Sequence, residues 1–178
     1  MLNNFQKSLQ LLLGEEKGFN DDPRDSGNLL GDGRAGCTNL GVTQAAWEEY
    51  LGHQVSRKDM QALTPDKVSP FYKMKYWNPT YCDVLPSGLD YCLFDFAVNH
   101  GTGGAVKILQ QAIGCVPDGV IGPRTIQMIQ QKDVAETIKK FTMAKEDYYK
   151  ALKSFPIYGH GWIARSEKVR QDSLNMVK

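Results

Sequence analysis

The first fifteen residues carry apolar side chains three and four positions apart. These apolar residues are Phe5, Leu9, Leu12 and Leu13. This spacing is typical of an amphipathic helix with one buried face, and it predicts a helix over residues 3–16. Gly18 follows where a glycine commonly ends a helix. Glu16 is therefore expected at the end of a packed helix, facing the loop that follows.

The helical pattern stops after this segment and returns only near residue 44. Residues 18–41 are dense in Gly, Asp and Asn, which is typical of a loop, and Gly31-Asp32-Gly33 is a candidate for a short hairpin. Thr43 is a suitable N-cap for a helix over residues 44–51, which Gly52 would end. If the protein contains any sheet, we expect it in residues 18–41.

The rest of the chain predicts a succession of helices. They are expected over residues 56–63, 65–77 with an interruption at Pro70, 89–99, 105–113, 123–131, 133–154 and 160–176. Residues 89–99 are strongly apolar, which predicts a central buried helix. No low-complexity linker separates these segments. We therefore predict a mainly α fold in one domain, residues 1–178, with a first lobe over 1–85 and a helical lobe over 86–178.

Two carboxylates flank the turn-rich stretch after the first helix. Glu16 and Asp25 are nine positions apart, and Thr38 follows in the same loop. Hydrolysis of a glycosidic bond needs one carboxylic acid that is kept protonated and a second, ionised carboxylate. A glutamate at a helix C-terminus lies at the unfavourable end of the helix dipole, which suits a general acid. The Thr38 hydroxyl is a candidate for holding the attacking water together with Asp25.

Each of these assignments has a competing interpretation. Adjacent helical positions point about 100° apart, so either Glu15 or Glu16 would face a cleft, but not both. The rivals of Asp25 are Asp21, Asp22 and Asp32, because aspartates in loops are often solvated turn residues. Thr38 has the alternative of being a plain strand or turn residue. The spacing of a calcium-binding EF-hand loop is not met.

The apolar helix over 89–99 ends in polar residues. Asp95 and Asn99 are one turn apart and share a face. They form either a buried polar network or, with His100, part of a saccharide-binding surface. Several aromatic residues are further candidates for stacking on sugar rings, although most large aromatics at helical spacing belong to a core. These aromatics are Trp47, Tyr76, Trp77, Tyr81, Tyr158 and Trp162.

The motifs resemble those of the phage and bacterial N-acetylmuramidases of glycoside hydrolase family 108. Glu16-Lys17-Gly18-Phe19 is similar to the Glu-Gly-Gly-Tyr motif that opens the family, and Asp25 matches its aspartate nine positions later. Thr38-Asn39-Leu40-Gly41-Val42-Thr43 matches its Thr-Asn-x-Gly-Ile-Thr run. The chain departs from the family at Lys17 and Phe19. It also places Thr38 thirteen positions after Asp25, where the family has about five, through an insertion at residues 29–35.

The resemblance extends over nearly the whole chain. The segments that carry it further are Phe94–Gly101, Asp118–Thr125 and Gly161–Arg165. They look like the C-terminal part of the same family, which is itself similar to peptidoglycan-binding modules. The resemblance implies a lysozyme-like fold and cleavage of the β-1,4 bond between N-acetylmuramic acid and N-acetylglucosamine in peptidoglycan. It implies a phage endolysin that waits in the host cytoplasm until a holin opens its way to the periplasm and cell wall.

The resemblance also implies roles for individual residues. Glu16 would protonate the glycosidic oxygen, and Asp25 with Thr38 would place a water or stabilise the oxocarbenium-like state. The predicted substrate-binding residues are Asn39, Asn99 and His100. No metal and no organic cofactor is implied. The rival functions are a lytic transglycosylase, a non-catalytic peptidoglycan-binding protein, and a phage structural or secretion-accessory protein.

The charge of the whole chain predicts no partner, because it is +1 over 178 residues. Its distribution is uneven: residues 1–60 hold nine acidic and six basic side chains, whereas residues 132–178 hold ten basic and six acidic ones. The basic end is either a solvated helix face or a surface attracted to an anionic polymer such as a cell wall. We expect a monomer with no nucleic-acid partner.

Neither a membrane span nor a secretion signal is expected. No run approaches the ~18–20 apolar residues that a membrane span needs, and the N-terminus lacks the pattern of a signal peptide. We therefore expect cytoplasmic synthesis and no stable membrane insertion. The four cysteines, at positions 37, 82, 92 and 115, lack metal-ligand spacing and are expected to remain free thiols.

Overall fold

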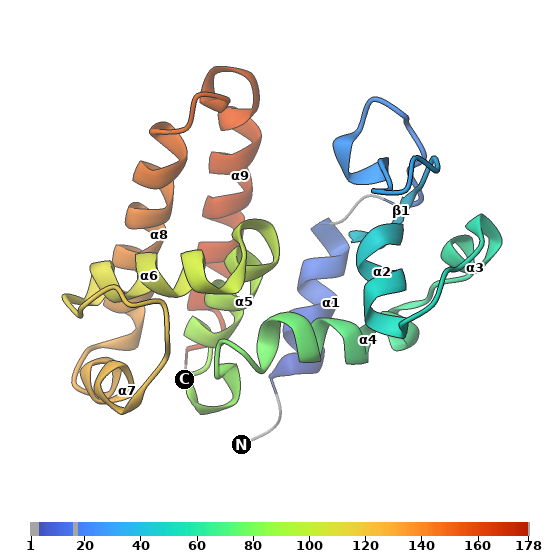
Figure 1. Cartoon of the computed structure of the whole chain (residues 1–178). Helices are drawn as coiled ribbons and strands as arrows, with labels where there is room; N and C mark the ends of the chain where they lie inside the picture. Colours follow the sequence, from blue (N-terminus) through green and yellow to red (C-terminus); the bar gives the residue numbers. More distant parts are fainter. Residues whose placement is uncertain (1–3, 16–17, 178) are drawn as a thin grey trace. The chain divides into compact units, whose positions relative to one another are not determined.

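The computed structural model describes residues 4–15 and 18–177 (Figure 1). The chain divides into two compact units. We call residues 6–75 the loop unit, and residues 1–5 together with 76–178 the helical unit. The units divide after residue 75, earlier than the division expected after residue 85. That the whole chain forms one domain stays a prediction.

The loop unit combines short helices with a small hairpin. Its elements are α1 (Phe5–Glu15), the 3₁₀ turn η1 (Ser26–Asn28), β1 (Thr38–Asn39), β2 (Val42–Thr43), α2 (Gln44–Leu51), α3 (Arg57–Gln61), α4 (Pro65–Tyr72) and the π-helical turn η2 (Lys73–Trp77), which runs on into the helical unit. The predicted caps of α2 are confirmed. The Thr43 side chain accepts the N–H of Ala46, and Gly52 ends α2 with φ +74°. Pro70 lies inside α4, where it has no N–H for the helical ladder, and the helix passes into a π-helical turn soon after.

The sheet is an antiparallel hairpin of β1 and β2. Thr38 pairs with Thr43, and Asn39 pairs with Val42. The two turn residues, Leu40 and Gly41, both have positive φ (50° and 72°), as in a type I′ turn. This hairpin lies later in the chain than the one expected near Gly31-Asp32-Gly33. Around Gly31-Asp32-Gly33 the chain forms only an isolated β-bridge, between Leu29 and Ala35.

The helical unit is built from five helices and a 3₁₀ turn in the part that the structure describes. These are η3 (Cys82–Val84), α5 (Leu89–His100), α6 (Thr102–Ile113), α7 (Pro123–Gln130), α8 (Val134–Lys150) and α9 (Phe155–Leu174). The helices α8 and α9 lie side by side and antiparallel, and α6 packs on both α5 and α8 (Figure 1). Helix α9 begins earlier than predicted because Pro156 occupies its first turn, a position that suits proline. The predicted mainly α fold with a short hairpin is confirmed.

Helix α5 is the core of the helical unit. Every residue from Leu89 to Ala97 is buried, as its apolar sequence predicts. The Phe94 ring meets the rings of Phe5 and Trp77 at centroid distances of 6.0 and 5.4 Å. At the start of the helix a Cβ on Gly88 would lie 2.3 Å from the carbonyl oxygen of Ser173, so only glycine permits this approach of α5 to the end of α9.

The described residues contain no helix that is both long and apolar enough to cross a membrane. In the same residues no group of three or more His, Cys, Asp or Glu side chains is arranged to hold a metal ion. All four cysteines are free thiols, and Cys37, Cys82 and Cys92 are buried.

Candidate active site

The candidate site lies in the loop unit and begins with a long-range backbone pairing. Asn20 and Thr38 exchange two backbone hydrogen bonds, at 2.8 and 2.7 Å. Arg57 of α3 lies over the Phe19 ring, 5.3 Å from its centroid, and forms an ion pair with Asp21. These contacts hold the segment after Gly18 against β1 and α3.

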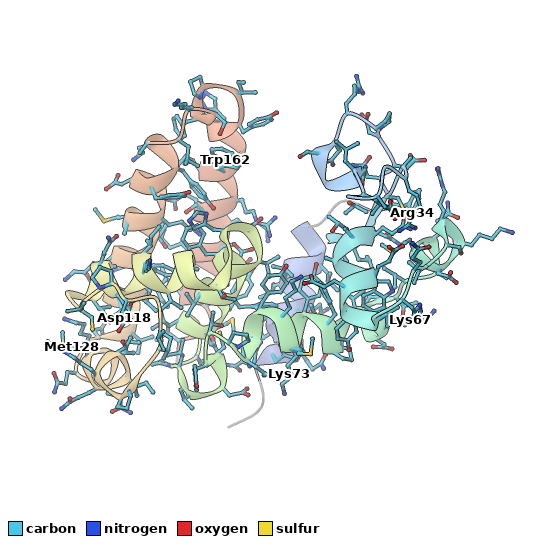
Figure 2. The ribbon with its side chains drawn as sticks, viewed as in Figure 1. Arg34, Lys67, Lys73, Asp118, Met128 and Trp162 are labelled. Atoms are coloured by element: carbon cyan, nitrogen blue, oxygen red, sulfur yellow. The ribbon has the colours of Figure 1, made fainter. Side chains whose placement is uncertain are left out.

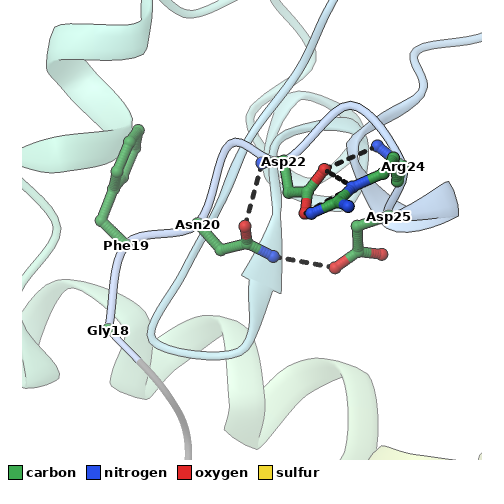
Figure 3. Close-up of a pocket in the computed structure, with 6 residues that line it drawn as sticks. All are labelled: Gly18, Phe19, Asn20, Asp22, Arg24 and Asp25. Atoms are coloured by element: carbon green, nitrogen blue, oxygen red, sulfur yellow. Dashed lines mark hydrogen bonds and ion pairs between the residues drawn. The ribbon is translucent and has the colours of Figure 1, made fainter.

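Asp25 is the N-cap of η1 and one wall of an open pocket (Figure 3). Its Oδ1 accepts the backbone N–H of Gly27 at 2.9 Å, and its Oδ2 accepts Nδ2 of Asn20 at 2.9 Å. The residue is otherwise exposed. Both oxygens of the carboxyl group thus accept N–H donors, and the group remains open to water.

The rival aspartates of the loop are all engaged by arginines. The ion pairs are Asp21–Arg57, Asp22–Arg24 and Asp32–Arg34. The arginine hydrogen bonds hold the pKa of Asp22 and of Asp32 below the usual value. Among the described residues no Lys or Arg pairs with Asp25. The contacts therefore favour Asp25 over its rivals as the carboxylate that is available to a substrate or water.

Thr38 lies beside Asp25 although thirteen positions separate them in the sequence. A Cβ on Gly27 would be 3.3 Å from Oδ1 of Asp25 and 3.9 Å from Oγ1 of Thr38, so both side chains flank this glycine. The Thr38 hydroxyl donates to Oδ1 of the buried Asn28 at 2.8 Å. The structure thus brings the two predicted residues together, and the longer spacing does not separate them.

The insertion at residues 29–35 loops out between Asn28 and Gly36. The Gly36 N–H donates to the Asn28 carbonyl at 2.8 Å and closes the base of this excursion. Arg34 then fastens it to α2, because its Nη1 and Nη2 donate to the two carboxylate oxygens of Glu48 at 3.1 and 2.7 Å. This fork, together with Gln44, lowers the pKa of Glu48 to about 2.

The pocket beside Asp25 has a volume of about 520 Å³, within the ordinary range for small-ligand sites. It is lined by Gly18, Phe19, Asn20, Asp22, Arg24 and Asp25. Glu16, the predicted general acid, lies outside the described residues, as do Lys17 and the side chain of Glu15. The role of Glu16 stays a prediction.

The three predicted substrate-binding residues have different surroundings. Asn39 is buried, and its Nδ2 donates to the carbonyl of Met60 at 2.8 Å, which ties the hairpin to the end of α3. Asn99 and His100 belong to the helical unit. Asn99 is exposed and donates to the Asp95 carbonyl at 2.7 Å, whereas His100 stacks on Phe96, and burial lowers the pKa of its imidazole. Their contacts with substrate stay predictions.

Two asparagines escaped the sequence reasoning. Asn20 is a hydrogen-bond partner of the Asp25 carboxylate, and Asn28 is the partner of the Thr38 hydroxyl. Both positions depend on backbone pairings between separate segments of the loop. The only signal in the sequence is the general density of Asn and Asp over residues 18–41.

Comparison with known proteins gives two adjoining family matches. Residues 9–101 match the family described as Glycosyl hydrolase 108, and residues 104–167 match the one described as Predicted Peptidoglycan domain. The chain is similar to a solved structure titled "Structure of Brucella abortus SagA", with 33% sequence identity and a TM-score of 0.85 over 98% of this chain and 96% of that one. No curated protein matches the chain. The boundary between the two matched regions falls at the first turn of α6, inside the helical unit.

Proposed function

The chain belongs to the glycosyl hydrolase 108 family, and from this membership we propose that it is a muramidase that cleaves the β-1,4 bond between N-acetylmuramic acid and N-acetylglucosamine. The family and the adjoining peptidoglycan domain support a glycoside hydrolase that acts on peptidoglycan. The observation that carries the finer proposal is the Asp25 carboxylate. It lines an open pocket, nine positions after Glu16, and accepts only N–H donors from the described residues.

In the proposed reaction Glu16 donates a proton to the glycosidic oxygen as the bond breaks. Asp25 and Thr38 hold a water or stabilise the oxocarbenium-like state. The Thr38 hydroxyl proton is already donated to Asn28, so the lone pairs of its oxygen remain to accept a hydrogen bond from that water. The water's other O–H would point to Asp25, which is exposed and would take up the proton that the water loses as it attacks.

The test is the release of reducing ends from purified peptidoglycan, with mass spectrometry of the products. Glu16→Gln should lower the rate by at least ~10²–10⁴-fold, because the amide is too weak an acid to protonate the glycosidic oxygen, while Glu15→Gln stays close to wild type. Activity of Glu16→Gln above about a tenth of wild type contradicts its assignment as the general acid. Anhydromuramyl products would instead identify a lytic transglycosylase, and binding without any bond cleavage would identify a non-catalytic wall-binding protein.

We also propose that the enzyme is a phage endolysin that reaches the wall from the host cytoplasm through a holin. This proposal follows from the family resemblance of the motifs around Glu16, Asp25 and Thr38. Expression in a bacterial host with and without a co-expressed holin tests it by culture turbidity. Rapid clearing should require both proteins, and equal clearing without the holin contradicts the proposed route.

A further inference from the structure

A continuous row of aromatic rings runs across the helical unit from solvent to core. We call it the aromatic row: Tyr158 and Trp162 of α9, Tyr149 and Tyr148 of α8, and His100 at the end of α5. The successive ring centroids lie 5.9, 5.3, 6.0 and 4.3 Å apart. His100 then stacks on the fully buried Phe96 at 5.1 Å.

The rings of the row differ from the aromatic core beneath them. Phe96 and Phe141 are completely buried, whereas Tyr158 is 58% exposed and the other four members are half-buried. Tyr158 and Trp162 are one turn apart on α9 and therefore share a face of that helix. Figure 2 labels Trp162. Each ring is held by its neighbours and still presents part of its surface to solvent. Such rings are rigid platforms that are ordered before a ligand arrives.

Polar groups in fixed positions border the row. Arg165 follows Trp162 by three positions on α9, and its Nη2 and Nε donate to Oδ1 of the buried Asp95 at 2.8 and 3.2 Å. Burial, and after it the Asp95 carboxylate, raises the pKa of Tyr149. Asn99, one turn after Asp95 on α5, is exposed. The Arg165–Asp95 ion pair and the Asn99 amide thus accompany the aromatic surface.

We propose that the aromatic row binds the glycan strand of peptidoglycan, as a surface of the helical unit that adds to the pocket at Asp25. This inference rests on the proposed function in taking peptidoglycan as the ligand. The C–H faces of pyranose rings pack on aromatic rings, and ligand sites commonly combine such rings with a few placed polar groups. The Asn99 amide is suited to the N-acetyl groups of the sugars.

Charge complementarity favours this occupant over a second copy of the chain. The region that carries most of the row, residues 132–178, holds ten basic and six acidic side chains. Peptidoglycan strands carry carboxylates on their lactyl-linked peptides, so the net positive charge of this segment favours them as a partner, whereas two copies of the segment repel each other.

The test measures sedimentation with insoluble peptidoglycan in the Glu16→Gln background, which limits digestion. The row variants are Tyr158→Ala and Trp162→Ala, with Trp162→Phe as the conservative change. The control is Met143→Ala, which removes an apolar side chain of α8 that is 63% exposed and outside the row. Loss of a central aromatic anchor typically weakens binding about tenfold or more. We expect this loss for both alanine variants and near-wild-type binding for Trp162→Phe and Met143→Ala.

Two probes separate the glycan from its peptides: intact peptidoglycan, and peptidoglycan whose stem peptides have been removed by an amidase. The glycan assignment requires the alanine variants to lose affinity for both probes. It is overturned if the loss is confined to intact peptidoglycan, if Tyr158→Ala with an unchanged thermal melt binds like wild type, or if the row instead drives self-association without glycan.

Reducing-end release by the otherwise unmodified protein is scored separately. Bond cleavage with binding that ignores the row refutes this inference and leaves the proposed function standing. Binding that depends on the aromatic row, without bond cleavage, refutes the proposed function and leaves this inference standing.

Discussion

The loop unit and the helical unit hold their candidate residues by different physical means. Around Asp25 and Thr38 the contacts are hydrogen bonds and ion pairs on a loop, and the position of each side chain depends on one or two named donors, such as Asn20 and Asn28. Around the aromatic row the support is the packed helix α5, whose side chains from Leu89 to Ala97 are all buried. A loop of this kind is sensitive to the loss of a single polar atom, whereas a packed support is sensitive to the loss of volume.

The largest effect is expected from cutting the chain where the two matched family regions meet. A fragment of residues 104–178 lacks α5, against which α6, α8 and α9 pack. Each large apolar side chain left without its partner forfeits ~1.5–3 kcal/mol. A few such losses equal the ~5–15 kcal/mol stability of a typical domain. We expect no cooperative thermal melt from this fragment. The control is the fragment of residues 76–178, which keeps α5 and should melt cooperatively. A cooperative melt of the fragment 104–178 would show a peptidoglycan domain that folds alone.

The next effect sharpens the choice of carboxylate in the loop unit. Asp25→Asn should lower turnover by roughly 10²-fold or more, because the amide can still cap η1 but cannot take up a proton. Asp22→Asn is the matched control, since it disturbs the pair with Arg24 in the same pocket. Initial rates of reducing-end release and peptidoglycan pull-down are the measurements. A larger loss of rate for Asp22→Asn would mean that the wrong aspartate has been chosen.

A smaller effect is expected from releasing the insertion. Arg34→Ala removes the fork to Glu48 and should reduce turnover several-fold with only a small decrease in Tm, since the pair is partly exposed. Arg34→Lys should recover only part of this, because lysine cannot form the two-pronged contact. Lys75→Ala breaks the exposed ion pair with Glu49, which lies on α2 next to Glu48, and it should change neither the thermal melt nor the rate. Equal behaviour of the Arg34 and Lys75 variants would show that the fork does not position the loop.

The smallest effect is a pH dependence of the protein's stability that arises from His100 in the aromatic row. Burial lowers the pKa of His100 below its ordinary 6.5, so the unfolded chain binds a proton more readily than the folded one. The stabilising contribution of neutral His100 is therefore fully present above about pH 6.5, and it is lost as the pH falls from there to the pKa of His100 in the folded protein. The shift in Tm should be smaller than the ~2–4 °C that 1 kcal/mol produces in a chain of this size. His100→Gln should remove this component, whereas His160→Gln, at an exposed site, should keep it.

Much of the fold was predictable because helix ends are decided by local chemistry. Thr43 and Gly52 bound α2 as their side chain and backbone preferences indicate. The hairpin was placed too early, at a Gly-Asp-Gly sequence with the composition of a tight turn. The chain instead turns at Leu40-Gly41, with a leucine in the left-handed region, and the Tyr72 hydroxyl donates to the Leu40 carbonyl from a distant helix. A hydrogen bond between residues so far apart in the sequence cannot be predicted from the residues next to the turn.

The site was predictable in its charged groups and less so in its supports. Asp25 and Thr38 came from the motif spacing and lie side by side, but the hydrogen bonds from Asn20 and to Asn28 depend on segments that meet only in the fold. Among the aromatic candidates, Trp47 and Trp77 belong to the core, in keeping with the usual fate of large rings at helical spacing. Exposure, which separates Tyr158 from them, comes only with the packed structure.

The closed base of the insertion makes its tip a place where the chain can change length at little cost. The hydrogen bond from Gly36 to Asn28 fixes both ends of the excursion, and residues 31–33 are exposed. Doubling the length of a flexible loop costs only about 0.6 kcal/mol of closure entropy. Related chains can therefore lengthen or shorten this tip, and an engineer can graft an affinity tag or a cell-targeting peptide there, while Asp25 and Thr38 stay where they are.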